Sequence, residues 1–358
     1  MRIRPYLVLL RRNRSFTRLY LAQLISFGGD WFAQVALLGL VIELTGSAAA
    51  ASLVLVLQML PFFLASPVAG VLADRLDRRR LMVAADVARA VAALAFLLVR
   101  DPSLLWVALL ATATISALSA FFEPTSSAAL PNLVEEEDLP VANVLLGSAW
   151  GTMLAVGAAI GGVVAVVFGR DAAFLLDAAS FALSAALIVR IRGSFGGASA
   201  GDRATSASAP SSPASLSTPT LNPPRRAWSG IFAAQVEALA FARSSHAVAA
   251  FLLAKATFGV GNGVILLLAV FGAVVFDAGD VGIGLLFAAR GLGALLGPFV
   301  ARLAFGFDQR GLVVGIGVAF FLFLGAYLAL PLAPGLAVAC GLVFVGHLGG
   351  GAQWTLST

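Results

Sequence analysis

Ten apolar segments, each long enough to cross a lipid bilayer as an α-helix, dominate this chain of 358 residues. Crossing the hydrocarbon core takes about 20 residues at a rise of about 1.5 Å per residue. Hydrophobic residues make up 60% of the chain and charged residues only 11%, whereas about a quarter of a soluble domain is charged. This composition excludes a cytosolic enzyme, a disordered protein and a secreted disulfide scaffold, and it predicts an all-α polytopic membrane protein. The segments span roughly residues 17–43, 48–72, 81–99, 103–123, 140–168, 172–191, 247–275, 281–304, 311–330 and 334–357.

Basic residues are distributed unevenly between the two sides that these segments define. Of the 23 basic residues, 18 fall in the N-terminal tail and in connections that lie on the same side. Cytoplasmic loops carry an excess of Lys and Arg, so we expect this side, and the N-terminus with it, to be cytoplasmic. The basic side would face anionic lipid head groups, and we expect no nucleic acid to bind there. The sequence thus predicts a multi-pass protein of the cytoplasmic membrane.

Residues 193–227 divide the chain into two parts. They are rich in Gly, Ala, Ser, Thr and Pro, a composition that cannot bury a core, so we predict a flexible linker. Residues 228–245 alternate apolar and polar side chains at helical spacing, which favours an amphipathic helix on the cytoplasmic membrane face; a soluble lid helix is the alternative. We expect residues 1–192 to form an N-terminal six-helix bundle and residues 246–358 to form a C-terminal bundle of four helices.

The connection after the second segment carries a specific motif. Its sequence from Gly70 to Arg80 is GVLADRLDRRR. It resembles motif A of the major facilitator superfamily, which joins the second and third helices on the cytoplasmic side, and Asp77 stands where that motif has its second glycine. The resemblance implies a two-bundle fold of about twelve helices. A chain with ten segments is therefore expected to be truncated at its C-terminal end.

Motif A also implies a conformational gate. Asp74 would lie at the cytoplasmic end of a helix, beside arginines that can pair with it and with the ends of neighbouring helices. Such bonds would hold the inner side closed and break when it opens. The alternative is that the arginines only anchor the loop to lipid. The gating residues that we predict are Gly70, Asp74, Arg75, Arg78 and Arg79.

Shorter stretches resemble the drug-exporter branch of the same superfamily, which includes macrolide and siderophore efflux proteins. They are NRSF at 13–16, SFGGD at 26–30 and LPNLV at 130–134. The glycine-rich stretch 157–162 resembles the antiporter motif, with Ala158 where proline is usual. The resemblance implies a transporter rather than an enzyme, with a cavity between two bundles. The sequence contains no nucleotide-binding loop of the GxxxxGK[ST] type, so we expect no ATP hydrolysis and no cofactor.

The first segment carries polar side chains along one arc. Gln23, Ser26, Asp30 and Gln34 recur at helical spacing, and in lipid such an arc must face protein or water. Asp30 would lie about 20 Å along the helix from its cytoplasmic start. A carboxylate at that depth could bind and release a proton as a cavity alternates between the two sides. A structural hydrogen bond or ion pair is the alternative.

The second half offers basic partners for that carboxylate. Lys255, the only lysine of the chain, lies in the middle of the seventh segment, with Asn262 on the same face. We therefore consider an Asp30–Lys255 or an Asp30–Arg290 pair. Alternatively, Lys255 extends to a lipid head group.

The fourth segment has a polar arc of its own. Thr112, Ser116, Ser119 and Glu123 would form a second wall of the cavity, with Glu123 toward the cytoplasmic mouth. Phe27 in the first segment could contact an amphipathic molecule, although packing is the commoner role of a buried aromatic ring.

Other polar and small residues inside the segments are interpreted as structural. Asp86 and Arg89 are three residues apart and can pair within one helical turn, whereas Asp177 is assigned no purpose. Three glycine pairs have the small-xxx-small spacing that lets helices approach closely, and they are Gly147/Gly151, Gly157/Gly161 and Gly293/Gly297. The two histidines are isolated, so no metal site is predicted.

These observations lead to a hypothesis of secondary active transport. The protein would export amphipathic small molecules by proton antiport with alternating access, acting as a monomer. The alternatives are export of a siderophore or another metabolite by the same fold, or a truncated membrane protein that does not transport. The proton-coupling candidates are Asp30, Glu123, Lys255 and Arg290. The substrate-cavity candidates are Gln23, Ser26, Phe27, Gln34, Thr112, Ser116, Ser119 and Asn262.

Overall fold

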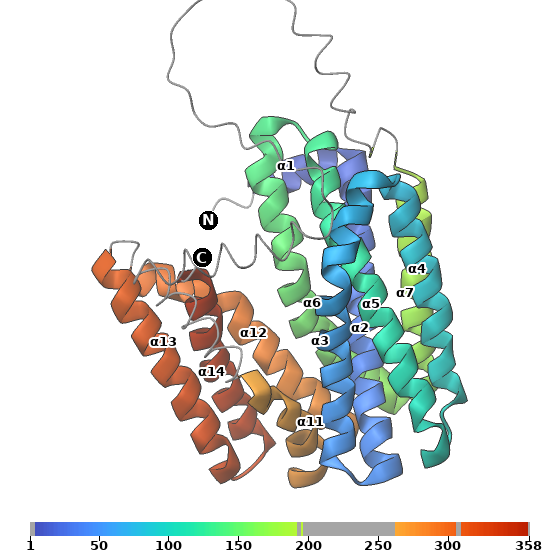
Figure 1. Cartoon of the computed structure of the whole chain (residues 1–358). Coiled ribbons are helices and arrows are strands. Elements are labelled where there is room, and N and C mark those ends of the chain that lie inside the picture. Colours follow the sequence, from blue (N-terminus) through green and yellow to red (C-terminus); the bar gives the residue numbers. More distant parts are fainter. Residues whose placement is uncertain (1–3, 192–194, 196–261, 306–308, 357–358) are drawn as a thin grey trace, which may run out of the picture. The chain divides into compact units, whose positions relative to one another are not determined.

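The computed structural model describes residues 4–191, 195, 262–305 and 309–356, and all regular structure in these ranges is helical (Figure 1). Within them, nine helices are long and apolar enough to cross a membrane. This confirms the expected all-α polytopic fold. The predicted linker apart from residue 195, the predicted amphipathic helix 228–245 and the first half of segment 247–275 lie outside the described residues.

The described helices follow the predicted segments closely. A short helix, α1 (Arg4–Arg12), precedes α2 (Arg14–Thr45), α3 (Ala48–Arg75), α4 (Arg78–Leu94), α5 (Leu105–Ala129), α6 (Leu139–Val167) and α7 (Arg170–Val189). The second half contains α11 (Leu268–Val270), α12 (Gly279–Phe305), α13 (Gln309–Ala329) and α14 (Leu336–Leu356). Short 3-10 helices lie at Ala95–Leu98, Pro102–Leu104, Leu130–Asn132, Glu136–Asp138, Asn262–Leu267 and Leu330–Leu332, and a π-helical turn lies at Phe271–Val275.

Local sequence signals set the helix ends. Asn13 caps the start of α2, where its Oδ1 accepts a hydrogen bond from Phe16 N at 2.9 Å. Gly46 ends α2 in the left-handed region at φ +60°, and Ser47 caps the start of α3. Asp77 caps α4 by accepting a hydrogen bond from Arg80 N at 2.8 Å. The residue that replaces the second glycine of motif A therefore starts the next helix.

Glycine contacts bring several helices close together. α2 packs on α6 and α7, α12 packs on α6 and α14, and α3 and α4 both pack on α5. A Cβ at Gly161 would lie 2.9 Å from the Phe32 Cα of α2, and one at Gly297 would lie 2.8 Å from the Ala352 N of α14. Two of the three predicted small-xxx-small pairs, Gly157/Gly161 and Gly293/Gly297, thus lie in tight helix contacts. Gly147 of the third pair has open space around it.

Large apolar side chains cover much of the outer surface. Phe63 and Leu64 on α3 are 65% and 70% exposed, and Phe321 on α13 is 73% exposed. A water-soluble protein rarely leaves such surfaces uncovered, whereas lipid tails cover them at no cost. The polar groups that matter for function must therefore be sought between the helices.

Candidate functional site

Arg89 on α4 lies at the centre of a buried charged group in the N-terminal half. Its side chain is 2% exposed and forms an ion pair with Asp86, one turn earlier, which confirms the pair predicted from their spacing. It also donates a hydrogen bond to Ser119 Oγ on α5 at 3.3 Å. The rings of Phe122 on α5 and Phe181 on α7 lie 4.8 Å and 4.5 Å from its Cζ. These cation–π contacts stabilise a charge in a place that water does not reach.

Three more carboxylates surround this arginine. Asp30 on α2 interacts electrostatically with Arg89, Asp86 and Glu123. Asp177 on α7 interacts with Asp30 and Arg89. Asp177 is 1% exposed, and its Oδ1 has no hydrogen-bond partner among the described residues. We call Asp30, Asp86, Arg89, Glu123 and Asp177 the carboxylate cluster.

The carboxylate cluster has more acids than bases. It holds four carboxylates and one guanidinium, so it would carry three net negative charges if every acid were ionised. Uncompensated charge in a low-dielectric interior is very unfavourable unless a proton or a cation neutralises it. The chemistry that this arrangement can support is therefore reversible binding of a positive charge.

The sequence identified only part of the carboxylate cluster. Asp30 and Glu123 are predicted coupling residues, and the structure brings them together. Arg89 and Asp86 are interpreted from sequence as a structural pair, and Asp177 is left without a role. The signal that finds them is an ionisable residue inside an apolar segment, which is expensive to keep there and therefore a candidate for function.

The polar arc of α2 faces protein, as its spacing requires. Gln23, Ser26 and Gln34 are all buried, while Phe27 is half-buried. Gln34 Oε1 accepts a hydrogen bond from Gln58 Nε2 on α3. The arc therefore extends from the carboxylate cluster to the contact with α3.

The hydroxyls of the α5 arc are engaged within the protein. Ser116 Oγ accepts a hydrogen bond from Phe62 N at 3.2 Å and donates one to the Gln58 carbonyl at 2.5 Å. A regular helix would join these two backbone groups of α3 to each other, and Pro61 lies beside them. Ser116 thus bonds two backbone groups of α3 beside its proline. Its role in a substrate cavity, like that of the two residues Thr112 and Ser119 on the same arc, stays a prediction.

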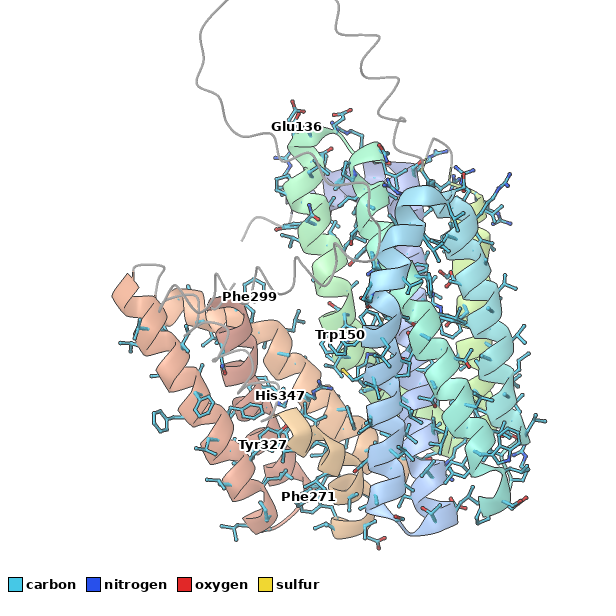
Figure 2. The ribbon with its side chains drawn as sticks, viewed as in Figure 1. Glu136, Trp150, Phe271, Phe299, Tyr327 and His347 are labelled. Carbon is cyan, nitrogen blue, oxygen red and sulfur yellow. The ribbon has the colours of Figure 1, made fainter. Side chains whose placement is uncertain are left out.

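Arg290 on α12 lies in a second polar group, formed with the other half of the chain. Its Cζ lies 5.7 Å from the ring of Trp150 on α6 and 5.9 Å from that of Phe287. It interacts electrostatically with Tyr327 on α13 and His347 on α14, which Figure 2 labels. No ion pair joins Arg290 to Asp30, whose charged neighbours lie on α4, α5 and α7, so the Asp30–Arg290 pair considered above is not formed.

The motif A loop binds the ends of helices through one arginine. Arg78 Nη1 donates to the Ala128 carbonyl at the end of α5 at 2.8 Å, and its Nε donates to Ala73 O at 3.3 Å. Arg79 lies over the Phe195 ring, 5.1 Å from its centroid. A cation at the carbonyl end of a helix is favourable because it meets the negative end of the helix dipole. These contacts show what Arg78 and Arg79 bind; the role of the motif A residues as a gate stays a prediction.

Four of the predicted residues cannot be placed at the level of side chains. Lys255 lies outside the described residues, and so does any pair with Asp30. The backbones of Asp74, Arg75 and Asn262 are described, but their side chains are not.

An ion triad joins the two halves at the other end of α2. Arg170 Nη1 lies 2.5 Å from Glu43 Oε2, and Arg170 Nε lies 2.8 Å from Asp280 Oδ2. These residues come from the start of α7, the end of α2 and the start of α12. Gly39 makes room for the triad, because a Cβ there would lie 3.2 Å from Arg170 Nη2. We call these three charged residues the outer triad.

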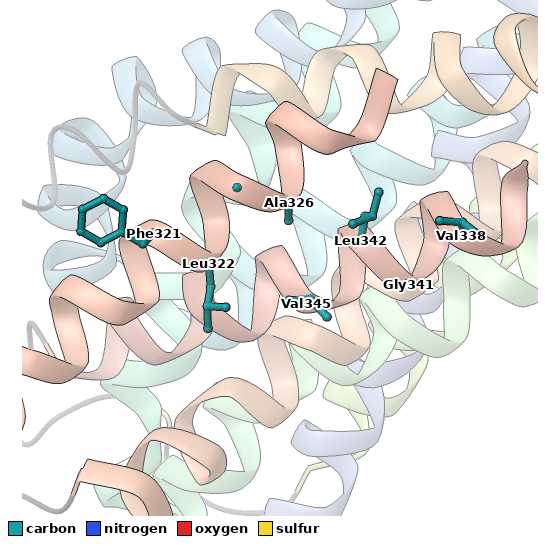
Figure 3. Close-up of a pocket in the computed structure, with 8 residues that line it drawn as sticks. Phe321, Leu322, Ala326, Val338, Gly341, Leu342 and Val345 are labelled. Atoms are coloured by element: carbon teal, nitrogen blue, oxygen red, sulfur yellow. The ribbon is translucent and has the colours of Figure 1, made fainter. Parts of the chain in front are cut away.

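An apolar groove of about 500 Å³ lies between α13 and α14 (Figure 3). Leu322, Ala326, Leu342 and Val345 are among the side chains around it. It offers no charged group to orient a polar ligand, so it is a weaker candidate site than the two charged groups.

Membrane-spanning helices with charges buried between them are typical of integral membrane transporters. A family profile of the Major Facilitator Superfamily matches residues 19–358. The chain therefore belongs to the Major Facilitator Superfamily, and its family and fold are those of transporters rather than enzymes.

Curated relatives are similar over parts of the chain. The uncharacterized MFS-type transporter YfiS of Bacillus subtilis (strain 168) is 29% identical over 181 residues, covering 50% of this chain and 43% of the relative. Macrolide efflux protein A of Streptococcus pyogenes is 32% identical over 127 residues, 35% of this chain and 31% of the relative. The multidrug efflux pump Tap of Mycobacterium tuberculosis (strain ATCC 25618 / H37Rv) is 31% identical over 193 residues, 51% of this chain and 45% of the pump. The matched part thus covers less than half the length of each relative.

Solved structures support the fold. A bacterial homologue of the human lysosomal transporter Spinster has a TM-score of 0.65 at 18% identity, covering 96% of this chain and 75% of that one. A bacterial homologue of the iron transporter ferroportin has a TM-score of 0.66 at 15% identity, covering 96% and 82%. At such low identity these likenesses establish the major facilitator fold and nothing finer.

Proposed function

We propose that this protein is a secondary active transporter that exports amphipathic small molecules across the cytoplasmic membrane in exchange for protons. The observation that carries the proposal is the carboxylate cluster, where four acids share one buried arginine; Asp86 and Asp177 are buried, and Asp30 and Glu123 are half-buried. A proton is the smallest charge that neutralises such a surplus. Binding it in one state and releasing it in another is what proton coupling requires.

The relatives support the substrate class. Two of them are named as a macrolide efflux protein and a multidrug efflux pump. Each is matched over less than half of its length, so the assignment of drug-like substrates to this chain is part of the proposal. Export of a siderophore or another metabolite by the same fold is the second candidate.

Neighbouring residues of α2 offer a path for coupling. Asp30 belongs to the carboxylate cluster, whereas Trp31 packs against Trp150 on α6 and Phe287 on α12, with ring centroids 6.2 Å and 5.7 Å apart. A change of charge at Asp30 that shifts α2 would therefore reach the contact between the two halves. Packed helices respond to such shifts by moving between discrete arrangements rather than by continuous deformation.

Alternating access completes the proposal. The N-terminus would be cytoplasmic, and the motif A residues would form the inner gate, with Arg78 releasing the helix ends when that side opens. The bundles 1–192 and 246–358, joined by the linker 193–227, would rock about a central site, and one copy of the chain would suffice.

The test is proton-driven transport by the purified chain in proteoliposomes. An imposed pH gradient should drive uptake of an amphipathic fluorescent dye, measured by fluorescence. Asp30→Asn and Asp177→Asn should each lower gradient-driven uptake by about tenfold or more, because each removes a proton-binding group. Dye exchange without a gradient should remain, because the substrate site is not changed.

Asp171→Asn is the matched control. Asp171 lies on the same helix as Asp177 but pairs with Arg100 at 2.8 Å, and its side chain is 49% exposed. Its substitution should leave uptake unchanged. Unchanged uptake in Asp30→Asn and Asp177→Asn would remove the carboxylate cluster from the mechanism. Folded protein that moves no dye, drug or metabolite under any gradient would favour the non-transporting alternative.

A further inference from the structure

Arg290 is a half-buried cation with no anion beside it among the described residues. In the part of the chain that the structure describes, no carboxylate forms an ion pair with it, and its Nε has no hydrogen-bond partner. It lies in the middle of α12, far along the helix from Asp280 at its start. An arginine inside a membrane normally pairs with an acid or a backbone carbonyl. The described residues supply no carboxylate for Arg290, which leaves its guanidinium available to an anionic ligand.

A second polar group close to Arg290 is also incompletely bonded. His347 on α14 is 3% exposed, and its Nε2 has no hydrogen-bond partner in the described residues. Its Nδ1 lies 3.3 Å from the Tyr327 hydroxyl and 3.2 Å from the Val343 carbonyl, which orient the ring. Gly293, one turn beyond Arg290, lets α14 approach, since a Cβ there would lie 2.8 Å from His347 Cβ.

An aromatic surface borders the same place. Trp150 on α6 is 40% exposed although it lies in the middle of a membrane helix, and its ring is 5.7 Å from Arg290 Cζ. Trp31 meets this ring edge-on and also contacts Phe287. An indole face beside a guanidinium suits a ligand that carries a ring next to its charged group.

We propose that Arg290, His347 and Trp150 form a substrate subsite that binds the carboxylate group of an aromatic, amphipathic anion. The guanidinium would donate hydrogen bonds to both carboxylate oxygens, and the ring of the ligand would lie on Trp150. His347 would donate from Nε2–H in the tautomer whose Nδ1 accepts from the Tyr327 hydroxyl. The subsite rests on the proposed function, since it names the substrate class of that transporter. It shares no residue with the carboxylate cluster, so separate groups would hold the anion and the proton.

The test compares three ligands that share a ring and differ in charge. Tritiated 2-naphthoate, 2-naphthamide and 2-naphthylmethylammonium are bound to the purified full chain in detergent by scintillation proximity, without any gradient. The wild type should prefer the anion over the amide and the ammonium. Arg290→Gln should weaken 2-naphthoate binding by about tenfold or more and leave 2-naphthamide within about twofold, because only the anion forms charge-assisted hydrogen bonds. Arg290→Lys keeps the charge but loses the planar guanidinium, which can donate two parallel hydrogen bonds to a carboxylate. Its affinity for 2-naphthoate should therefore lie between those of the wild type and Arg290→Gln.

Arg100→Gln, the loss of an exposed arginine, is the matched control and should bind all three ligands as the wild type does. Equal binding of the anion and the amide by the wild type, or a parallel loss of both in Arg290→Gln, would show that Arg290 only packs against rings. Wild-type protein that binds none of the ligands would also overturn the subsite. If Arg290→Gln elutes as aggregate, the comparison of Arg290→Lys with wild type decides. If the ligands bind as expected but an imposed pH gradient drives no transport, the proposed subsite is retained and only the proposed proton coupling is overturned.

Discussion

Gly29 is the residue that lets α2 approach α7 beside the carboxylate cluster. A Cβ at this position would lie 2.9 Å from Asp177 Oδ1 and 2.7 Å from Ser180 Cβ. Contacts this short force a helix or a buried side chain to move. Gly29 therefore sets how close Asp30, the next residue, comes to the acids of the neighbouring helix.

We expect Gly29→Ala to destabilise the protein by about 1–3 kcal/mol, the usual cost of overpacking. This cost should exceed the gain of about 1 kcal/mol that alanine brings to a helix. Thermal unfolding in detergent would measure it as a lower midpoint. Gly325→Ala on α13 is the matched control, because nothing lies within 4 Å of a Cβ there, and its midpoint should not fall. Equal midpoints for the two variants would contradict the close approach.

At the scale of residues, helical periodicity predicts which side chains share a face of one helix. It does not predict which neighbouring helix packs against that face. The arc of Gln23, Ser26 and Gln34 is buried as its spacing required. The group around Arg89 depends on which helices become neighbours, and the spacing within one helix carries no such information. For the same reason, spacing alone left two partners open for Asp30, and the described residues show no ion pair between Asp30 and Arg290.

At the scale of helices, α5 contributes a hydroxyl, that of Ser116, to two backbone groups of α3 beside Pro61. Ser116→Ala would leave Phe62 N–H and the Gln58 carbonyl without the hydroxyl that bridges them. Unpaired backbone groups in an apolar interior cost about 1–3 kcal/mol. We expect a loss of stability of this size, measured by the same thermal unfolding.

Thr114→Ala is the matched control for this change. Thr114 lies on the same helix, and its hydroxyl donates a hydrogen bond to Leu110 O, one turn earlier in that helix. Its loss should cost little. If the midpoint of thermal unfolding is no lower in Ser116→Ala than in Thr114→Ala, Phe62 N–H and the Gln58 carbonyl must bond to each other without the hydroxyl. The hydrogen bonds of Ser116 would then not be needed for stability.

Helix bounds were predictable because the apolar runs and their caps are local. The seventh segment, expected as one helix over 247–275, differs most, because its described part is a 3-10 helix (Asn262–Leu267), the short α11 and a π-helical turn (Phe271–Val275). Among the ends of the long helices, the largest difference is in α5, which is expected to end at residue 123 and continues through Pro124 to Ala129. Proline tends to end a helix in water. Inside a membrane protein, however, neighbouring helices satisfy the freed backbone groups, and the helix continues.

At the scale of the whole molecule, the sequence predicted two bundles but not what joins them. Nothing in the sequence near Arg170 indicates a partner for it. The structure shows it bonded both to Glu43 at 2.5 Å and to Asp280 at 2.8 Å, so it links α2 and α7 to α12. Partners 110 and 127 residues away cannot be found from local spacing. The outer triad lies at the end of α2 opposite to motif A, where it is suited to hold the halves together on one side of the membrane.

We expect Arg170→Gln to separate the halves at this end. The buried Asp280, only 6% exposed, would lose the cation that pairs with it, and an unpaired buried carboxylate favours arrangements that admit water. Spin labels on cysteines introduced at Ser103 and Ala278, in a Cys340→Ser background, report the distance between α5 and α12 at their outer ends. Double electron–electron resonance should show this distance several ångströms longer in Arg170→Gln.

Arg100→Gln separates this effect from a general loss of surface charge. Arg100 pairs with Asp171 through two hydrogen bonds of 2.9 Å and 2.8 Å, and both residues belong to the N-terminal half. Breaking this pair removes an arginine from the same side of the membrane without touching α12, so the spin–spin distance should stay at its wild-type value. A distance that lengthens equally in both variants would mean that the outer triad does not hold the halves. A distance that lengthens only in Arg170→Gln would make the triad the outer counterpart of the motif A loop, because each would then hold helix ends together on its own side of the membrane.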